Sequence, residues 1–246
     1  MHKPAALGIR GHVDGAGILF GDRTGGVSAP PFDTANAGYC RGDDPEAVAE
    51  NRRRLGAVLG GPAADPSRWF CLRQHHGAVV VAASRSAVLP PGDASVTTDP
   101  DVTLAILTAD CGPLALVTRA ATGAVHAGWR GVAAGVVEAA VERVAVAGGH
   151  TPRAVLGPCV RPCCYEFAPD DLEPLAERFG PGVRARTADG RPALDLPAAI
   201  GVALRRAGVV DLVDLGTCTA CSPRHFSHRR EGRTGLQVML VTGPHA

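Results

Sequence analysis

Glycine and proline punctuate the whole sequence, with 31 Gly and 20 Pro among 246 residues. Both residue types interrupt regular structure, so the chain is restricted to short helices and strands joined by tight turns. No apolar run approaches the roughly 18 residues that a membrane span requires. Residues 1–15 also lack the long apolar stretch of a signal peptide. We therefore expect a cytoplasmic protein that makes no membrane contact.

Helix signals are strongest in two segments. In residues 42–61, Asp44 can cap a helix, Pro45 suits the first turn and Gly60 can end it. Residues 131–149 carry apolar side chains at helical spacing throughout, which predicts a second helix. The positions expected to face the core are Val48, Leu55 and Leu59 in the first helix and Val132, Val136, Val137, Ala140, Val141 and Val144 in the second. Shorter helices are expected after Asp171 and from Asp195 onward, the latter partly burying Ile200, Val202 and Leu204.

Short apolar runs predict the strands. They lie at residues 78–84, 103–108, 114–118, 154–157, 209–215 and 237–242. Strands and helices alternate only in part along the chain. This order favours a mixed α/β (α+β) domain over a regular doubly wound sheet.

The charge balance and the cysteines exclude several classes of protein. The 25 basic residues nearly cancel the 24 acidic ones, so there is no electrostatic signature of nucleic-acid binding. Eight cysteines are too few for a disulfide scaffold at this length. The C-x-x-C at 218–221 has the spacing of a metal knuckle, but there is no second C-x-x-C. We therefore expect core or pocket-lining thiols at Cys159, Cys163, Cys164, Cys218 and Cys221.

Three short stretches concentrate reactive side chains, namely QHHG (74–77), TADCGP (108–113) and VHAGWRG (125–131). Each lies at a chain turn, where functional residues are common. Their spacings are too long for a local metal knuckle, so only the fold could bring two histidines and a cysteine together. Taken singly, each residue is compatible with ordinary packing or hydrogen bonding. Neighbours on an extended chain point to opposite faces, so at most one of His75 and His76 should face a site.

In this order the three stretches resemble the signature of the laccase-domain family, also called the multicopper polyphenol oxidase or purine nucleoside phosphorylase-like family. The family pattern is Q-x-H-G, T-A-D-C-x-P and H-A-G-W-R-G. Further stretches that resemble family segments are 23–28, Asn36 with 42–55, 156–167 and 218–237. The chain departs from the pattern at Leu236, where the family commonly has Arg, and at His75, where Val is usual. The resemblance implies one domain over residues 1–246, with mixed sheets between helical layers in the order α-β-β-α.

The resemblance also implies a catalytic metal centre. His76, Cys111 and His126 would be both catalytic residues and metal ligands, with zinc as the metal and copper as the alternative. Three protein ligands with an open fourth position are typical of catalytic zinc. Asp110 could orient a ligand histidine, or it could cap a turn. His76 would be the ligand of its pair, with Gly77 letting the chain turn close to the metal.

The function implied by the family is phosphorolysis of purine nucleosides (adenosine, inosine and methylthioadenosine) to the free base and ribose 1-phosphate, together with adenosine deamination. The partners would be nucleosides and phosphate, without nucleic acid, and the protein a monomer or small homo-oligomer. Phosphate could bind Arg130 at a helix start near Gly131. The other candidate residues for substrate or phosphate are Arg23, Asn36, His228 and Arg229. Tyr165 and Phe167 could stack on a purine or pack in the core.

Three other functions are compatible with the same residues. Two histidines and a cysteine also form the trigonal set of a blue-copper oxidase, with Met239 as a candidate axial ligand, although the chain has no H-x-H pair. Cys111 could instead be the nucleophile of an amide hydrolase that edits cell-wall precursors, with His126 or His76 as its base. The metal could also only brace the fold.

Overall fold

Two mixed β-sheets form the centre of the molecule. The computed structural model describes residues 7–39, 42–85 and 89–244. The first sheet has the strand order β1-β2-β13-β6-β3. Its strands are β1 (Gly8–Val13), β2 (Ala16–Gly21), β3 (Trp69–Cys71), β6 (Thr103–Thr108) and β13 (Gln237–Thr242). All its pairings are antiparallel except that of β3 with β6.

The second sheet has the order β12-β9-β7-β8-β5-β4. Its strands are β4 (Val80–Ala82), β5 (Ala94–Thr97), β7 (Gly112–Val117), β8 (Thr122–Ala127), β9 (Arg153–Leu156) and β12 (Leu212–Asp214). Parallel pairs lie at its two edges, where β12 meets β9 and β4 meets β5. A separate two-stranded ribbon pairs β10 (Arg184–Arg186) with β11 (Pro192–Leu194).

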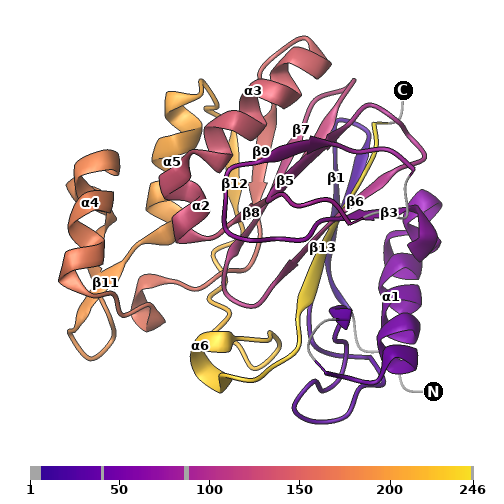
Figure 1. Cartoon of the computed structure of the whole chain (residues 1–246), viewed down its shortest axis with the longest axis horizontal. Helices are drawn as coiled ribbons and strands as arrows, with labels where there is room; N and C mark the ends of the chain where they lie inside the picture. The colour runs from indigo at the N-terminus through magenta and orange to yellow at the C-terminus, as the bar shows by residue number, and fades with distance from the viewer. Residues whose placement is uncertain (1–6, 40–41, 86–88, 245–246) are drawn as a thin grey trace.

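Helices cover the outer face of each sheet (Figure 1). They are α1 (Pro45–Leu59) on the first sheet and α2 (Trp129–Ala134), α3 (Val136–Gly148) and α5 (Leu196–Arg206) on the second. Helix α4 (Pro169–Phe179) packs against α5, and the short α6 (His228–Glu231) lies below the sheets in the view of Figure 1. One-turn 3₁₀ helices lie at Gly61–Ala64, Pro66–Arg68, Pro162–Cys164 and Pro181–Val183. Each of these helices is too short or too polar to cross a membrane.

Three buried clusters of apolar side chains define the layers. The inner faces of the two sheets pack together through residues such as Phe20, Ile106 and Ala124. Leu55 of α1 packs against Leu19 and Leu240 on the outer face of the first sheet. Residues of α3 and α5 pack on the outer face of the second sheet. The layer order is therefore α-β-β-α, which confirms the predicted fold class.

The helix predictions hold where capping residues mark the ends. Asp44 caps α1 and Gly60 follows its last residue. Asp195 caps α5, in which Ile200 and Leu204 are fully buried. The single helix predicted over 131–149 is wrong, because Gly135 adopts a left-handed conformation (φ +93°) that separates α2 from α3. Glycine adopts this conformation at little cost. The apolar residues keep their helical spacing on both sides of Gly135, so the sequence pattern gives no sign of the break.

The strand predictions over 103–108 and 237–242 match β6 and β13, whereas those over 78–84 and 209–215 are too long. Several strands escaped prediction, and β8 is the most consequential of them. Its sequence, TGAVHA, is rich in small residues, and all six are buried. A strand covered on both faces has no polar alternation to mark it.

Candidate metal centre

The pairing register of three strands brings the predicted ligands together. β7 pairs with β8 so that Pro113 lies opposite His126, which places Cys111, one residue before β7, beside the end of β8. β5 pairs with the other side of β8. This pairing places Asp93, one residue before β5, next to His126, whose backbone N–H donates to the Asp93 carbonyl at 2.7 Å.

Asp93 holds two ligand-bearing segments at once. His126 Nδ1 donates to Asp93 Oδ1 at 2.8 Å. The backbone N–H groups of His76 and Gly77 donate to the two carboxylate oxygens at 2.9 and 2.7 Å, and that of His75 lies at 3.2 Å. Consecutive N–H groups that converge in this way form an anion-binding nest. The Asp93 side chain is fully buried, so this carboxylate is an internal clamp.

The backbone turns sharply at His76 and at Asp110, with φ of +62° and +102°. Such angles are strained for residues other than glycine and are often found at functional sites. The residue with the left-handed conformation is His76, whereas Gly77 leaves room for the turn, because a Cβ there would lie 2.5 Å from His75 Nε2. Alternation along a strand does not separate the two histidines, since neither lies in a strand. His76 joins the cluster of candidate ligands, whereas the His75 ring lies outside it with 46% of its side chain exposed.

Three ligand atoms converge from these segments. His76 Nε2 lies 3.7 Å from Cys111 Sγ, and one ligand atom from each of His76, Cys111 and His126 lies within 4.8 Å of the others. The two imidazole rings meet edge to face with centroids 4.8 Å apart. His126 is buried, Cys111 is intermediate and His76 is exposed, so the cluster opens to solvent on the His76 side.

This geometry fits a metal ion. Tetrahedral zinc, with bonds of about 2.3 Å to sulfur and 2.0 Å to nitrogen, separates its ligand atoms by about 3.4–3.6 Å. The measured 3.7 Å between Cys111 and His76 is close to that value. The bond from His126 Nδ1 to Asp93 leaves Nε2 as the ligand atom, an arrangement typical of metal-binding histidines. Three protein ligands would leave a fourth position of a tetrahedral ion open on the solvent side, unlike a closed four-ligand site.

The charges within the cluster reinforce one another. Burial alone would raise the pKa of Cys111, but His126 and His76 lower it to about 6 by charge and hydrogen bonding. Burial would lower the pKa of His126, but Cys111 and Asp93 raise it to about 9. Burial would raise the pKa of Asp93, but hydrogen bonds from His126 and the backbone lower it to about 2. At neutral pH Cys111 is therefore a thiolate, which is the form that binds metals.

Gly128 lines the cluster at close range. A Cβ atom at this position would lie 2.7 Å from His76 Cδ2 and 3.0 Å from Cys111 Sγ. Cβ atoms do not tolerate the first of these distances, so a larger residue would push His76 outward. The glycine of the VHAGWRG stretch thus allows the ligands to converge.

Aromatic and basic side chains lie beside the cluster. Trp129, Phe167 and Tyr165 form a chain of edge-to-face contacts with centroid separations of 5.1 and 5.5 Å. Arg130 stacks over Trp129 at 4.2 Å, and Arg229 lies over Tyr165 at 5.1 Å. Burial raises the pKa of Tyr165, the Cys111 charge adds to the effect, and both arginines oppose it. The phenol therefore lies within electrostatic range of the cluster and keeps its proton at neutral pH.

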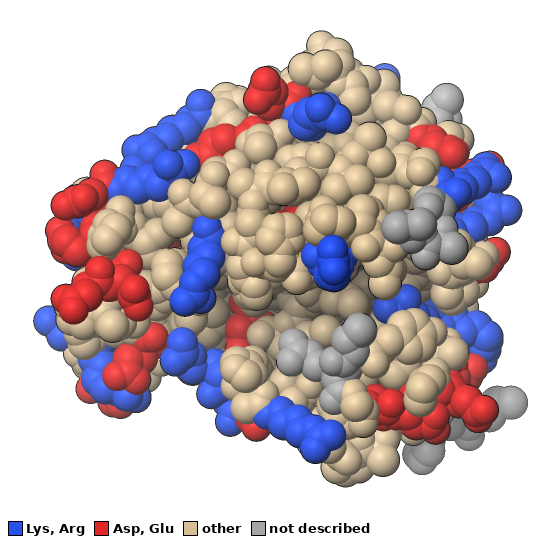
Figure 2. Space-filling view, viewed as in Figure 1, with Lys and Arg blue, Asp and Glu red and all other residues tan. Residues whose placement is uncertain are grey.

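The helix expected near Gly131 begins at Trp129, with Gly128 as its N-cap, so Arg130 lies in the first turn. Figure 2 shows a hollow near the middle of the viewed face, with basic side chains around it. Of the predicted anion-binding residues, Arg130 and Arg229 lie beside the aromatic side chains, Arg130 over Trp129 and Arg229 over Tyr165.

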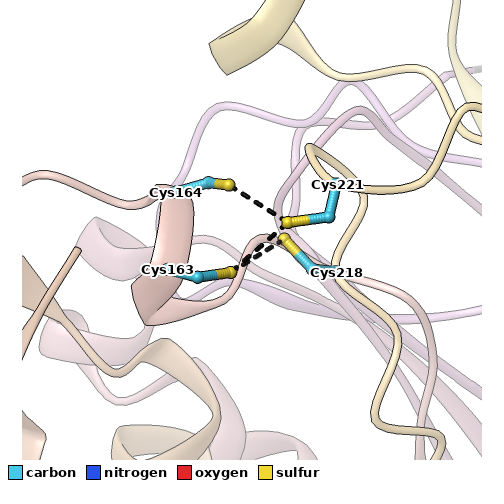
Figure 3. Close-up of side chains that lie close together, drawn as sticks. All are labelled: Cys163, Cys164, Cys218 and Cys221. Atoms are coloured by element: carbon cyan, nitrogen blue, oxygen red, sulfur yellow. Dashed lines mark hydrogen bonds between the residues drawn. The ribbon is translucent and has the colours of Figure 1, made fainter. Parts of the chain in front are cut away.

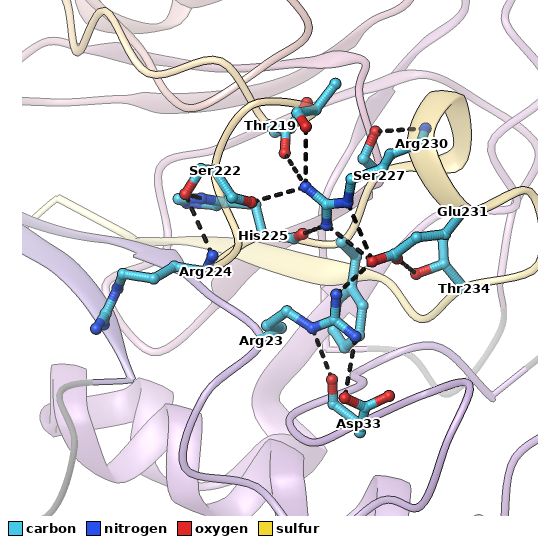
Figure 4. Close-up of polar contacts among 12 residues, drawn as sticks. Arg23, Asp33, Thr219, Ser222, Arg224, His225, Ser227, Arg230, Glu231 and Thr234 are labelled. Atoms are coloured by element: carbon cyan, nitrogen blue, oxygen red, sulfur yellow. Dashed lines mark hydrogen bonds and ion pairs between the residues drawn. The ribbon is translucent and has the colours of Figure 1, made fainter.

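Two other predicted substrate-binding residues are committed to protein partners. Arg23 donates to the Asp33 carbonyl at 2.8 Å and pairs with the carboxylates of Asp33 and Glu231 at 3.1 and 2.5 Å (Figure 4). Two carboxylates already neutralise its charge, which argues against phosphate binding. The fully buried Asn36 side chain accepts from the backbone of Gly38 and Leu236 and donates to Asp43. Asn36 therefore links the segment around Gly38 and Asp43 to Leu236 by hydrogen bonds.

Arg23 belongs to a network that fixes α6, the helix that carries the remaining candidates. Arg230 donates to the carbonyls of Thr219, Ala220, Ser222 and His225, and its guanidinium also contacts Glu231 (Figure 4). His228 Nδ1 donates to the carbonyl of Gly232 at 2.6 Å. His228 thus closes its own helix, whereas the Arg229 side chain extends toward Tyr165.

The histidine-orienting carboxylate is Asp93, which sequence reasoning missed. Asp110 instead accepts from the Thr219 hydroxyl at 2.6 Å and from the backbone N–H of Arg229 at 2.7 Å. The turn-anchoring role considered for Asp110 is therefore the correct one. Asp93 lies in no recognised motif, and its one sequence signal is a charged residue that directly precedes the buried segment ASVT.

Comparisons with known proteins find matches that cover most of this chain. The family described as Multi-copper polyphenol oxidoreductase laccase matches residues 17–243. A purine nucleoside phosphorylase of Streptomyces coelicolor is 41% identical over 236 residues, which cover 93% of this chain and 96% of that protein. One from Mycobacterium tuberculosis is 42% identical over 225 residues, covering 89% and 88%.

Solved structures show the same architecture. YlmD from Geobacillus stearothermophilus superposes with a TM-score of 0.85 at 31% identity, covering 94% of this chain and 93% of that one. The hypothetical protein YfiH from Bacillus licheniformis superposes with a TM-score of 0.84 at 26% identity, covering 92% of each.

Proposed function

This chain belongs to the Multi-copper polyphenol oxidoreductase laccase family, and we propose that it is a zinc-dependent purine nucleoside phosphorylase with adenosine deaminase activity. The observation that carries the proposal is the convergence of His76, Cys111 and His126 beside paired aromatic and basic side chains. The names of its relatives in Streptomyces and Mycobacterium support the same activity. The substrates would be a purine nucleoside and inorganic phosphate.

In phosphorolysis, a phosphate oxygen bonds to the ribose C1′ while the bond from C1′ to the purine nitrogen breaks. The departing base takes up a proton. The chain must therefore hold an anion next to a flat heterocycle and supply a hydrogen bond to that heterocycle. Arg130 and Arg229 would bind the phosphate, since guanidinium groups match phosphate oxygens in pairs. Tyr165 and Trp129 would form the surface on which the base stacks.

Tyr165 suits a second task in this reaction. Its raised pKa keeps the phenol protonated through neutral pH, so it can donate a hydrogen bond to the purine. Arg229 lies over the same ring and connects the base and phosphate subsites. Asp110 accepts from the backbone N–H of Arg229 and so fixes the start of α6.

Deamination makes a different demand, because water must add at the purine C6 before ammonia leaves. A zinc ion held by His76, Cys111 and His126 would supply a water molecule whose pKa is lowered to about 7. Asp93 would keep His126 in the tautomer that such binding needs. The exposed His76 side of the cluster is where a nucleoside would approach.

Turnover with and without phosphate tests the proposal. Adenosine and inosine would be incubated with the purified protein and the products separated by chromatography. Ribose 1-phosphate that forms only with phosphate supports phosphorolysis, and inosine formed from adenosine without phosphate supports deamination. Failure to convert any purine nucleoside under either condition would overturn both activities.

Two variants test the phosphate subsite within that assay. Replacing Arg130 or Arg229 by Ala removes a guanidinium beside the aromatic group, so the KM for phosphate should rise about tenfold or more, equivalent to about 1.4 kcal/mol. Arg143→Ala, on the exposed surface of α3, is the matched control and should leave the KM unchanged. An unchanged KM in both site variants would contradict the assignment.

A cysteine hydrolase is the second candidate, because Cys111 and His126 favour a thiolate–imidazolium pair. Such a pair is the arrangement of cysteine nucleophiles, and it would attack an amide carbonyl without a metal. Amide hydrolysis that survives complete chelation would favour this function over the zinc one.

The family's description also names copper oxidation. Met239, the proposed axial ligand, is buried with Phe20 and Ile106 in the apolar layer between the sheets. This location argues against a blue-copper centre. Stoichiometric copper together with a blue absorption band would overturn the zinc assignment.

A further inference from the structure

A second group of ligand atoms lies apart from His76, Cys111 and His126. Cys163 and Cys164 lie in the 3₁₀ turn Pro162–Cys164, and Cys218 and Cys221 lie in a turn more than fifty residues later in the chain. Figure 3 shows the four sulfur atoms pointing toward one another from these two segments. The sequence analysis expected core or pocket-lining thiols at these positions, and the structure brings four of them together.

The sulfur separations are those of a single tetrahedral ion. Cys164 and Cys221 are 3.3 Å apart, Cys163 and Cys221 3.5 Å, and Cys163 and Cys218 3.7 Å. One ligand atom from each of the four residues lies within 4.8 Å of the others. Four sulfurs bound to zinc at about 2.3 Å are about 3.8 Å apart. A disulfide needs about 2.05 Å, so no pair is bonded in this arrangement.

Backbone contacts hold both segments in place. Cys159 donates from its N–H to the Thr217 carbonyl at 3.2 Å, and Thr219 donates back to the Cys159 carbonyl at 3.1 Å. The N–H groups of Cys221 and Arg161 also donate to the Cys218 sulfur. Hydrogen bonds from backbone N–H groups favour a thiolate over a thiol, because the charged acceptor is the stronger one. Burial would raise the pKa of Cys218, but these hydrogen bonds lower it, whereas burial raises the pKa of Cys163 to about 11 and also raises that of Cys164. A metal that binds all four sulfurs would therefore have to displace protons from Cys163 and Cys164.

We propose that Cys163, Cys164, Cys218 and Cys221 bind one zinc ion in a structural site. Four thiolates complete a tetrahedron and leave no position for water or substrate, unlike the three-ligand centre. Thiolate sulfur is soft and selects zinc over hard divalent cations such as magnesium. A [4Fe–4S] cluster gives each thiolate a different iron and a [2Fe–2S] cluster divides the four thiolates between two irons, so in both cases ligands on different irons would have to lie farther apart than these sulfurs do.

The site would fix two walls of the candidate active site. Cys164 directly precedes Tyr165, whose ring lies below Arg229. Thr219, between Cys218 and Cys221, donates to Asp110, the residue before the ligand Cys111. Zinc at the four-cysteine site would therefore hold the stacking surface and the Cys111 turn at a constant separation. It has no direct part in the reaction.

Metal counting separates the two sites. Protein purified from zinc-supplemented cells under reducing conditions should contain two zinc ions per chain by elemental analysis. The Cys163→Ser/Cys221→Ser double variant should retain one, as should Cys111→Ser, and the triple variant should contain none. Cys159→Ser is the matched control, because Cys159 adjoins Cys218 but is not among the four, and it should retain both ions.

A spectroscopic measurement keeps the proposal testable if the double variant fails to fold. Cobalt added to metal-stripped Cys111→Ser protein should give the intense visible bands of tetrahedral thiolate coordination at one equivalent. Absence of these bands would overturn the proposal. A mass lower by two hydrogens per sulfur pair in freshly purified, unreduced protein would also overturn it, because it would show disulfides in place of ligands.

Discussion

Replacing Asp93 by Asn changes one buried carboxylate while keeping the size of the side chain. That carboxylate accepts from His126 Nδ1 and from the backbone N–H groups of His76 and Gly77. An amide offers one accepting oxygen and one donating NH₂ group in their place. The NH₂ group must then face either the Gly77 N–H, which cannot accept, or His126.

Both orientations of the amide are unfavourable. If the NH₂ faces Gly77, a buried donor loses its partner, at a cost of about 1–3 kcal/mol in unfolding free energy. If it faces His126, Nδ1 must become the acceptor, and the proton moves to Nε2, the atom that would bind the metal. Changes to the group that holds a ligand histidine typically weaken metal affinity 10–100-fold, or about 1.4–2.7 kcal/mol. We expect a loss of this size for zinc in Asp93→Asn.

Zinc affinity would be measured by competition with a chromogenic chelator, and stability by urea unfolding of the metal-free protein. Asp22→Asn is the matched control, because Asp22 is also a buried carboxylate with protein donors but accepts from Thr24 and Arg224, neither of which belongs to the metal centre. The control should keep its affinity at the His76–Cys111–His126 centre within a few fold. Wild-type affinity in Asp93→Asn, or an equal loss in both variants, would refute the assignment of Asp93 as the clamp.

Three further predictions concern the same centre. His76→Ala should lose the bound metal while His75→Ala keeps it, since only His76 joins the ligand cluster; equal losses in elemental analysis would mean that the pair is wrongly assigned. Gly128→Ala should weaken zinc binding about tenfold, because its Cβ would lie 2.7 Å from His76, and unchanged affinity by chelator competition would contradict that crowding. In the metal-stripped protein the rate of Cys111 alkylation, followed by peptide mass spectrometry, should fall as the pH drops through about 6, because protonation removes the thiolate. In His126→Gln the midpoint should move up toward the ordinary thiol value of about 8.5, and an unmoved midpoint would show that the imidazolium does not stabilise the thiolate.

Local signals in the sequence account for the parts of the fold that were predicted. A capping Asp, a first-turn Pro and a following Gly specify the ends of α1 without help from the rest of the chain. The break at Gly135 has no comparable signal. Glycine is tolerated inside helices, and the apolar spacing of α2 and α3 continues across it. The choice between one helix and two is therefore made by packing in the folded protein and not by the local sequence.

Sequence motifs identified the candidate ligands, but no motif identified Asp93, the carboxylate that holds them in place. His76, Cys111 and His126 each lie in a recognisable stretch, but Asp93 becomes their neighbour only through the pairing of β5 with β8. Neither strand was predicted, because β8 carries no alternation of polar and apolar residues and β5 has only four residues. The same limit applies to the four cysteines, because a C-C pair and a distant C-x-x-C acquire meaning only when the chain folds them together.

The two groups of ligands are linked through one short path. Cys111 follows Asp110, whose carboxylate holds both Thr219, inside the C-x-x-C turn, and the first turn of α6. A displacement of the four-cysteine turn would therefore act on Asp110, which already has a strained backbone (φ +102°), and through it on Cys111. Tyr165 would shift with Cys164 on the opposite side. If the four cysteines bind zinc as proposed, four bonds would fix both segments and resist such movement, whereas a three-ligand centre would leave one position open.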